Sequence, residues 1–140
     1  MIEKKIEQVS YDYVYVAADG TEFADKGECQ AYENSAYGVL RGRLAKIALK
    51  QMSECDLFDG AGCDENESFI VVPKSEEEVT HIQQLAYMKA YNKETQAEKV
   101  AVGKVLVVTF SCDGDCVWIA DLGEIVSKAT DGKYKVVEAE

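Results

Sequence analysis

A strand-like run that leads into a capped helix start occurs three times in this sequence, and no other feature constrains the fold as much. The runs are VSYDYVYVA at 9–17 with the short return TEF at 21–23, FIVV at 69–72, and VWIA at 117–120. Each is followed by an acid or a serine with a glutamate three residues later: Asp25 with Glu28, Ser75 with Glu78, and Asp121 with Glu124. In this spacing the first side chain accepts a hydrogen bond from a backbone N–H of the first helical turn. The glutamate carboxylate in turn accepts a hydrogen bond from the backbone N–H of the capping residue. We therefore expect a helix to begin within about two residues of each first position.

Apolar residues at helical spacing predict how these helices extend. One helical stripe covers 26–51, with a break near Asn34 and Ser35 or at Gly38. Its expected inward residues are Cys29, Tyr32, Ala36, Leu40, Leu44, Ile47 and Ala48. A second helix is expected at about 76–91. Its apolar residues at helical spacing should point toward the core: Val79, Ile82, Leu85, Ala86 and Met88.

The last third of the chain has the pattern of a hairpin. KVLVVTF at 104–110 is the strongest apolar run, and SCDGDC at 111–116 turns the chain into VWIA. A short helix at 122–129 should end at Asp131 and Gly132, and KYKVV at 133–137 is expected as a last edge strand. The predicted class is α+β: a small, mainly antiparallel sheet with one long and one medium helix packed on one face, plus a short C-terminal helix.

Length and composition indicate one globular domain over 1–140. The chain has 140 residues, of which 47% are hydrophobic, and it has a single proline. No apolar run is long enough to span a bilayer, and the N-terminus lacks the apolar core of a signal peptide. We therefore expect a cytoplasmic protein whose five cysteines are reduced thiols.

The sequence contains no motif of a known catalytic site. His81 is the only histidine, and it lies inside the second predicted helix with no cysteine beside it in the sequence. A nucleophile elbow, a Walker A loop and a GxGxxG loop are all absent from the sequence. We expect a protein that is not an enzyme, with no catalytic residue and no cofactor.

Four cysteines leave a zinc site open as an alternative. Cys55, Cys63, Cys112 and Cys116 can supply four thiolates, and the protein would then be a zinc-supported accessory or enzyme module. Their spacings are seven and three residues, whereas structural zinc sites use close pairs, so only CDGDC is near the pattern. A contact between Cys112 and Cys116 across the hairpin turn, as two thiols or as a disulfide, fits the spacing better.

Charge is distributed very unevenly. The net charge of -11 makes nucleic-acid binding unfavourable, because such binding depends on lysine and arginine. From 54 to 78 there are nine acids and one lysine, so this segment carries about -8. A solvated loop is one interpretation. The other is a partner-binding surface for a basic groove of another protein, formed by Glu54, Asp56, Asp59, Asp64, Glu65, Glu67, Glu76 and Glu77. A basic helix with Arg41, Arg43, Lys46 and Lys50 is the competing surface.

Three segments resemble small proteins of bacteriophages and prophages. The run YVYVAADGTEFADKGECQAYE at 13–33, with its DG..F turn and its EC..YE helix start, is similar to the beginning of that group. IVVPKSEEEV at 70–79 and VWIADLGEIV at 117–126 are similar to later segments of the group. The resemblance implies a phage-encoded inhibitor of a bacterial defence or nucleic-acid-handling complex, of the anti-CRISPR kind. The implied partner is a host protein, in the host cytoplasm and not in the membrane.

Overall fold

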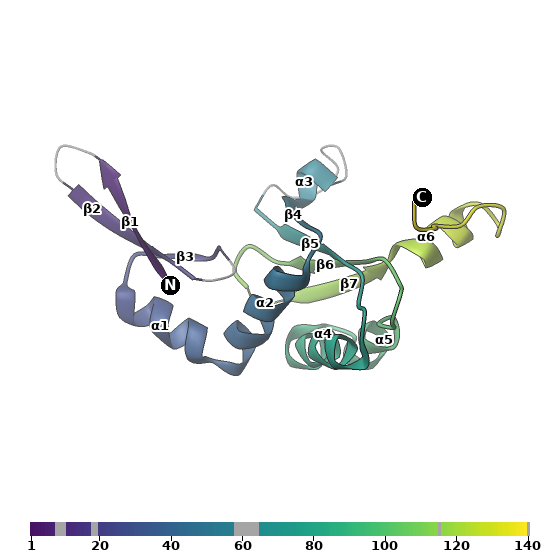
Figure 1. The fold of residues 1–140 in the computed structure, drawn as a ribbon, viewed down its shortest axis with the longest axis horizontal. Helices are drawn as coiled ribbons and strands as arrows, with labels where there is room; N and C mark the ends of the chain where they lie inside the picture. Colours follow the sequence, from purple (N-terminus) through teal and green to yellow (C-terminus); the bar gives the residue numbers. More distant parts are fainter. Residues whose placement is uncertain (8–10, 18–19, 58–64, 115, 140) are drawn as a thin grey trace. The chain divides into compact units, whose positions relative to one another are not determined.

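The computed structural model describes residues 1–7, 11–17, 20–57, 65–114 and 116–139. It confirms the α+β class, with antiparallel sheets and several helices (Figure 1). The chain divides into two compact units, Met1–Lys46 and Ile47–Glu140. One domain over the whole chain stays a prediction.

The first unit contains a three-stranded antiparallel sheet and most of a helix pair. Its strands are β1 (Ile2–Glu7), β2 (Tyr11–Val16) and β3 (Glu22–Phe23), in that order across the sheet. Ile2 pairs with Val16 and Tyr15 pairs with Phe23. The helices are α1 (Lys26–Asn34) and α2 (Ala36–Ile47). The Phe23 ring lies 5.2 Å from the Tyr32 ring, so β3 and α1 share an aromatic contact.

Ser35 divides the predicted long helix into two. Its hydroxyl donates to the Tyr32 carbonyl at 2.7 Å and accepts from the Gly38 N–H at 2.9 Å, so one side chain ends α1 and begins α2. Gly38 must lack a side chain here, because an added Cβ would lie 1.8 Å from the Tyr32 carbonyl oxygen. The break predicted near Asn34 and Ser35 is confirmed. Cys29, Leu40 and Leu44 are buried as expected, whereas Ala36 is exposed at the first position of α2.

The second unit is built on a four-stranded antiparallel sheet in the order β4-β5-β6-β7. Its elements in chain order are β4 (Lys50–Ser53), α3 (Glu54–Leu57), β5 (Glu67–Val71), α4 (Glu76–Lys89), α5 (Lys93–Glu98), β6 (Leu106–Phe110), β7 (Val117–Asp121) and α6 (Leu122–Ala129). The predicted hairpin is confirmed, since Phe110 pairs with Val117 across the turn. Figure 1 shows α4 and α5 along one face of this sheet.

The core of the second unit lies between this sheet and α4. All five residues of β6 are buried, and the Phe69 and Phe110 rings meet edge to face with centroids 5.6 Å apart. The predicted inward residues Val79, Ile82, Leu85 and Ala86 are buried. The prediction that Met88 points inward is wrong, since this residue is 41% exposed. It lies two residues after Ala86, and two residues correspond to about half a helical turn.

All three predicted helix caps are confirmed. The side chains of Asp25, Ser75 and Asp121 accept hydrogen bonds from the N–H groups of Glu28, Glu78 and Glu124, at 3.0, 3.2 and 3.2 Å. At α4 the glutamate also reaches back, but the Glu78 carboxylate accepts from the N–H of Lys74, one residue before the cap. The side chains of Ser75 and Glu78 therefore accept hydrogen bonds from backbone N–H groups on both sides of Ser75.

Two expectations about element boundaries are wrong, and one strand was missed. The helical stripe was extended to residue 51, but Lys50–Ser53 is strand β4, since Lys50 pairs with Ile70 and the Leu49 N–H donates to the Ile70 carbonyl. The charged segment Ile2–Glu7 forms β1, which was not predicted. KYKVV at 133–137 is not a strand: residues 134–139 are exposed and belong to neither sheet. Within the described ranges, no helix is both long and apolar enough to cross a membrane.

Candidate functional site

One row of residues runs across the end of the four-stranded sheet. Ser53 pairs with Glu67, Glu67 with Phe110, and Phe110 with Val117, while a parallel bridge joins Val117 to Ala90. Neighbouring strands lie about 4.8 Å apart, so the four steps of this row span roughly 20 Å. Because the strands are antiparallel, β4 and β6 end at this row whereas β5 and β7 begin there. The segments that join these strands therefore gather at one end of the sheet.

Acidic residues dominate this end of the sheet. We call it the acidic end and define it by Glu54 and Asp56 on α3, Glu65 and Glu67 before and in β5, and Asp113 in the hairpin turn. Asp113 comes from a distant part of the sequence, and sequence reasoning did not include it. The predicted binding residues Asp59 and Asp64 lie outside the described residues. On the β7 side the row ends at Ala90, beside Lys89, so the carboxylates concentrate toward β4 and the hairpin turn.

Asn66 ties the acidic end together. Its side-chain amide donates to a Glu54 carboxylate oxygen at 2.6 Å, and its side-chain oxygen accepts from the Cys112 N–H at 3.1 Å. The Glu54 N–H donates to the Asn66 carbonyl at 2.9 Å. Asn66 thus joins α3, the start of β5 and the hairpin turn through one residue.

The five acids of this end have different local roles. Glu54 is half-buried and bound by Asn66, and Glu67 accepts from the Gln51 amide at 2.7 Å, so both take part in the structure of the strand ends. Asp56 and Glu65 are exposed. Asp113 is also exposed and accepts from the Ser111 hydroxyl at 2.6 Å. The exposed carboxylates are the ones that can meet a partner.

Glu76 and Glu77 lie at the opposite end of β5. That strand runs from the row at Glu67 to Val71, and α4 begins only after Pro73 and Ser75. Both glutamates are exposed in the first turn of α4, where carboxylates are stabilised by the helix dipole. The predicted binding residues from 54 to 78 therefore belong to two separate places, and the structure does not bring them together.

The cysteines do not assemble into a metal site among the described residues. Cys29, Cys112 and Cys116 form no disulfide with another described residue. The contact between Cys112 and Cys116 across the turn stays a prediction. Cys55 lies in α3 at the acidic end, whereas Cys63 lies outside the described residues. No group of three or more histidine, cysteine, aspartate or glutamate side chains arranged for a metal ion exists in the part of the chain that the structure describes. The zinc alternative stays a prediction.

His81 is half-buried in the middle of α4. The absence of a catalytic role for it, and for the chain as a whole, remains a prediction.

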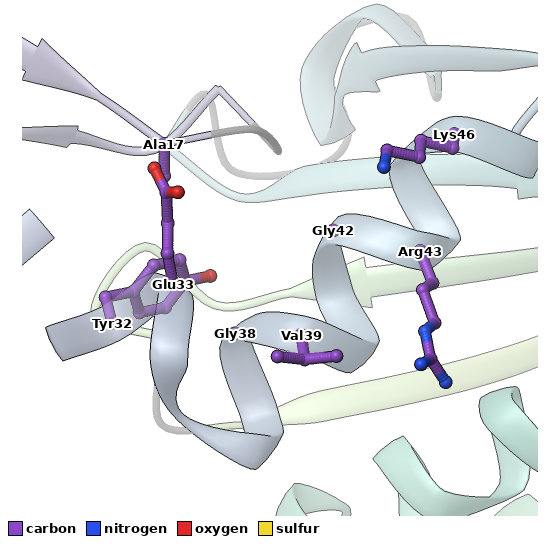
Figure 2. Close-up of a pocket in the computed structure, with 8 residues that line it drawn as sticks. All are labelled: Ala17, Tyr32, Glu33, Gly38, Val39, Gly42, Arg43 and Lys46. Carbon is purple, nitrogen blue, oxygen red and sulfur yellow. The ribbon is translucent and has the colours of Figure 1, made fainter. Parts of the chain in front are cut away.

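The basic helix is only partly as predicted. Arg41 is buried, with 7% of its surface exposed, and Lys50 belongs to β4. Arg43 and Lys46 are exposed on α2 and line a hollow of about 200 Å³ within the first unit. Figure 2 shows Tyr32 and Glu33 of α1 on one side of this hollow and Lys46 on the other. We call this feature the α1–α2 hollow; its remaining lining residues are Ala17, Gly38, Val39 and Gly42.

Comparison with known proteins gives no relative from which a function can be transferred. No protein-family model, no curated protein and no solved structure matches this chain. The functional argument therefore depends on the residues of the chain itself.

Proposed function

We propose that this protein is a non-enzymatic inhibitor that binds another protein, and that its acidic end competes for a basic groove of that partner. The observation that supports this most is the gathering of Glu54, Asp56, Glu65, Glu67 and Asp113 at one end of the four-stranded sheet. A patch of one charge on a fixed scaffold steers association with a surface of the opposite charge.

Rigidity of the scaffold favours this role. The strands that present the acidic end are joined by a continuous antiparallel ladder, and Asn66 bridges α3 to the hairpin turn. The starts of α3 and β5 and the hairpin turn are therefore held together at this end through Asn66. Binding by a preorganised surface loses less conformational entropy than binding by a free loop.

Charge and the resemblance to phage proteins support the proposed class of partner. Grooves that hold nucleic acid are lined by lysine and arginine, which a carboxylate surface can occupy in place of phosphates. Bacterial defence nucleases have such grooves, and the resemblance to phage and prophage proteins favours a target of this kind. The proposed partner is therefore a basic groove in a bacterial defence or nucleic-acid-handling complex.

Two charge variants of equal size test this function. The first replaces the exposed acids of the acidic end, as Asp56→Asn, Glu65→Gln and Asp113→Asn. The matched control removes three exposed charges elsewhere, as Glu76→Gln, Glu77→Gln and Glu138→Gln. Each variant and the wild type would be titrated with a host protein that the wild type captures, at about 50 and 200 mM salt, and association rates would be recorded.

We expect the first variant to associate more slowly and to lose most of its salt dependence, because steering by exposed charges is screened beyond roughly 8 Å at physiological salt. The control should bind like the wild type. Equal rates for all three proteins at both salt concentrations would exclude the acidic end as the binding surface. A larger loss in the control would place binding at the start of α4 instead.

A further inference from the structure

Residues 133–139 have the composition of a β-strand but no strand partner within the described chain. Their sequence, KYKVVEA, contains a tyrosine and two valines, which favour strands. Residues 134–139 are exposed and belong to neither sheet. From residue 135 to residue 139, no backbone N–H or carbonyl forms a hydrogen bond with another described residue. Unpaired backbone groups at the surface are a template for pairing with a further strand.

The end of α6 fixes where this segment begins and which way it runs. Gly132 has a φ of 77°, which suits a chain that reverses after a helix, and the Tyr134 N–H donates to the Thr130 hydroxyl at 3.2 Å. Val136 then lines the same hollow as Gly123 in the first turn of α6. Figure 1 shows the segment, in yellow, returning alongside α6. The segment and the helix therefore lie next to each other.

Helix α6 adds apolar residues that its own chain leaves uncovered. They recur at helical spacing on one face, and none of them is buried: Leu122, Ile125, Val126 and Ala129. Ile125 is 48% exposed, and on the segment Tyr134 and Val137 are 68% and 67% exposed. We call α6 and residues 133–139 together the α6–tail surface. An amphipathic helix whose apolar face stays exposed is suited to contact with another molecule.

The charge of the α6–tail surface allows it to meet its own copy. Residues 122–139 contain three acids and three lysines, so their net charge is zero, whereas the second unit as a whole carries about -9. The surface follows Asp121, at the other end of β7 from the acidic end. Two copies can therefore approach here without the repulsion that the acidic end would cause.

We propose that the α6–tail surface is a self-association site, in which residues 133–139 pair antiparallel with the same residues of a second copy. When the two-fold axis passes between Lys135 and Val136, Lys133 lies opposite Glu138 of the second copy and Tyr134 lies opposite its Val137. Symmetry makes each of these pairs occur twice. Opposite charges and aromatic–aliphatic pairs both stabilise an antiparallel ladder. A ribbon of two strands alone is marginally stable, so the apolar face of α6 completes the contact.

Sedimentation equilibrium of the full chain tests for this dimer, in reducing buffer at physiological salt and from micromolar to millimolar concentration. We expect a monomer–dimer equilibrium that dissociates on dilution, because a contact of this size belongs to the small, transient class. The backbone amide signals of α6 and of residues 133–139 should shift with concentration. A chain that stays monomeric at millimolar concentration, or a dimer whose shifts lie elsewhere, would overturn the proposal.

Charge reversal then tests the pairing itself. Lys133→Glu alone places two acids opposite each other, and Glu138→Lys alone places two lysines there, so each should weaken dimerisation about tenfold. An equimolar mixture of the two variants restores both opposite-charge pairs and should recover wild-type association. Unchanged association of the single variants, or no recovery in the mixture, would exclude this pairing.

The matched controls are Lys26→Glu in α1 and Glu98→Lys at the end of α5, which each reverse one exposed charge outside the α6–tail surface. Both should dimerise like the wild type. All four variants should keep the wild-type midpoint of chemical denaturation, which separates a lost contact from a lost fold. Equal weakening by the controls would mean that net charge, and not this pairing, governs association.

Discussion

Ser68 and Thr109 face each other across β5 and β6 inside the core, with their hydroxyl oxygens 2.8 Å apart. Both residues are almost completely buried. A buried hydroxyl without a partner is costly, whereas a satisfied pair contributes little net stability. At the residue scale this pair therefore enforces the register of β5 against β6, because a slip would leave two hydroxyls unpaired.

A double-mutant cycle measures this coupling. Thr109→Val alone should lower the free energy of unfolding by about 1–3 kcal/mol, because it leaves the Ser68 hydroxyl unpaired. Adding Ser68→Ala should cost much less than Ser68→Ala costs by itself, since no hydroxyl then remains unsatisfied. Chemical denaturation of the four proteins gives the coupling, and strictly additive losses would show that the hydrogen bond does not matter.

Asp121 makes stability depend on pH. Burial acts to raise the pKa of Asp121, but the Lys104 ammonium, 3.1 Å away, and the N–H groups at the start of α6 outweigh it and hold this pKa below its usual value. A carboxyl whose pKa is lowered by folding stabilises the protein above its unfolded pKa, and this stability is lost as pH falls through the folded value. Unfolding free energies measured from pH 7 down to 2.5 should therefore fall more steeply below about pH 4 in the wild type than in Asp121→Asn. Parallel pH profiles for the two proteins would contradict this assignment.

At the scale of elements, helix starts are fixed by local capping. The Ser75 hydroxyl accepts from the Glu78 N–H, and Glu78 in turn holds the Lys74 N–H. Ser75→Ala should therefore lower the free energy of unfolding by about 0.5–2 kcal/mol. Ser127→Ala, an exposed site inside α6, is the matched control and should change stability little. Denaturation midpoints compare the two, and equal midpoints would remove the cap assignment.

The elements that the sequence predicted are those whose signal is local. Two residues at a fixed spacing suffice for a cap, and a DG turn between apolar runs suffices for the β6–β7 hairpin. β4 was mistaken for helix because Lys50 and Gln51 are polar and exposed, and only pairing with Phe69 and Ile70 makes this segment a strand. The acidic end could not be predicted for the same reason. Asp113 is brought to the same end of the sheet as Glu54 by the strand register and by the hydrogen bonds of Asn66, and no local sequence pattern encodes either.

At the scale of the whole molecule, charge is divided unequally between the two units. Residues 1–46 contain eight acids and six basic residues, so they carry about -2. The remaining eighteen acids and nine basic residues give residues 47–140 about -9. The larger unit therefore dominates long-range electrostatic steering.

The second unit has its own core, so we expect it to fold when it is expressed alone. The buried residues Phe69, Leu85 and Phe110 all belong to it, and its sheet contains strands from this unit only. A fragment of residues 47–140 should show helix and sheet by circular dichroism and a cooperative thermal transition. A coil spectrum would instead mean that residues 1–46 are needed for its stability.

The position of β6 determines which part of the second unit opens least often to solvent. β6 is flanked by β5 and β7, and every one of its side chains is buried. Its amide protons can exchange with deuterium only when the four-stranded sheet comes apart, whereas those of the edge strand β4 exchange through local fluctuations. The slowest amides of Leu106–Phe110 thus report the global unfolding free energy of this unit in native buffer, without denaturant. A ligand that binds only the folded protein should slow them, even when it contacts a distant surface.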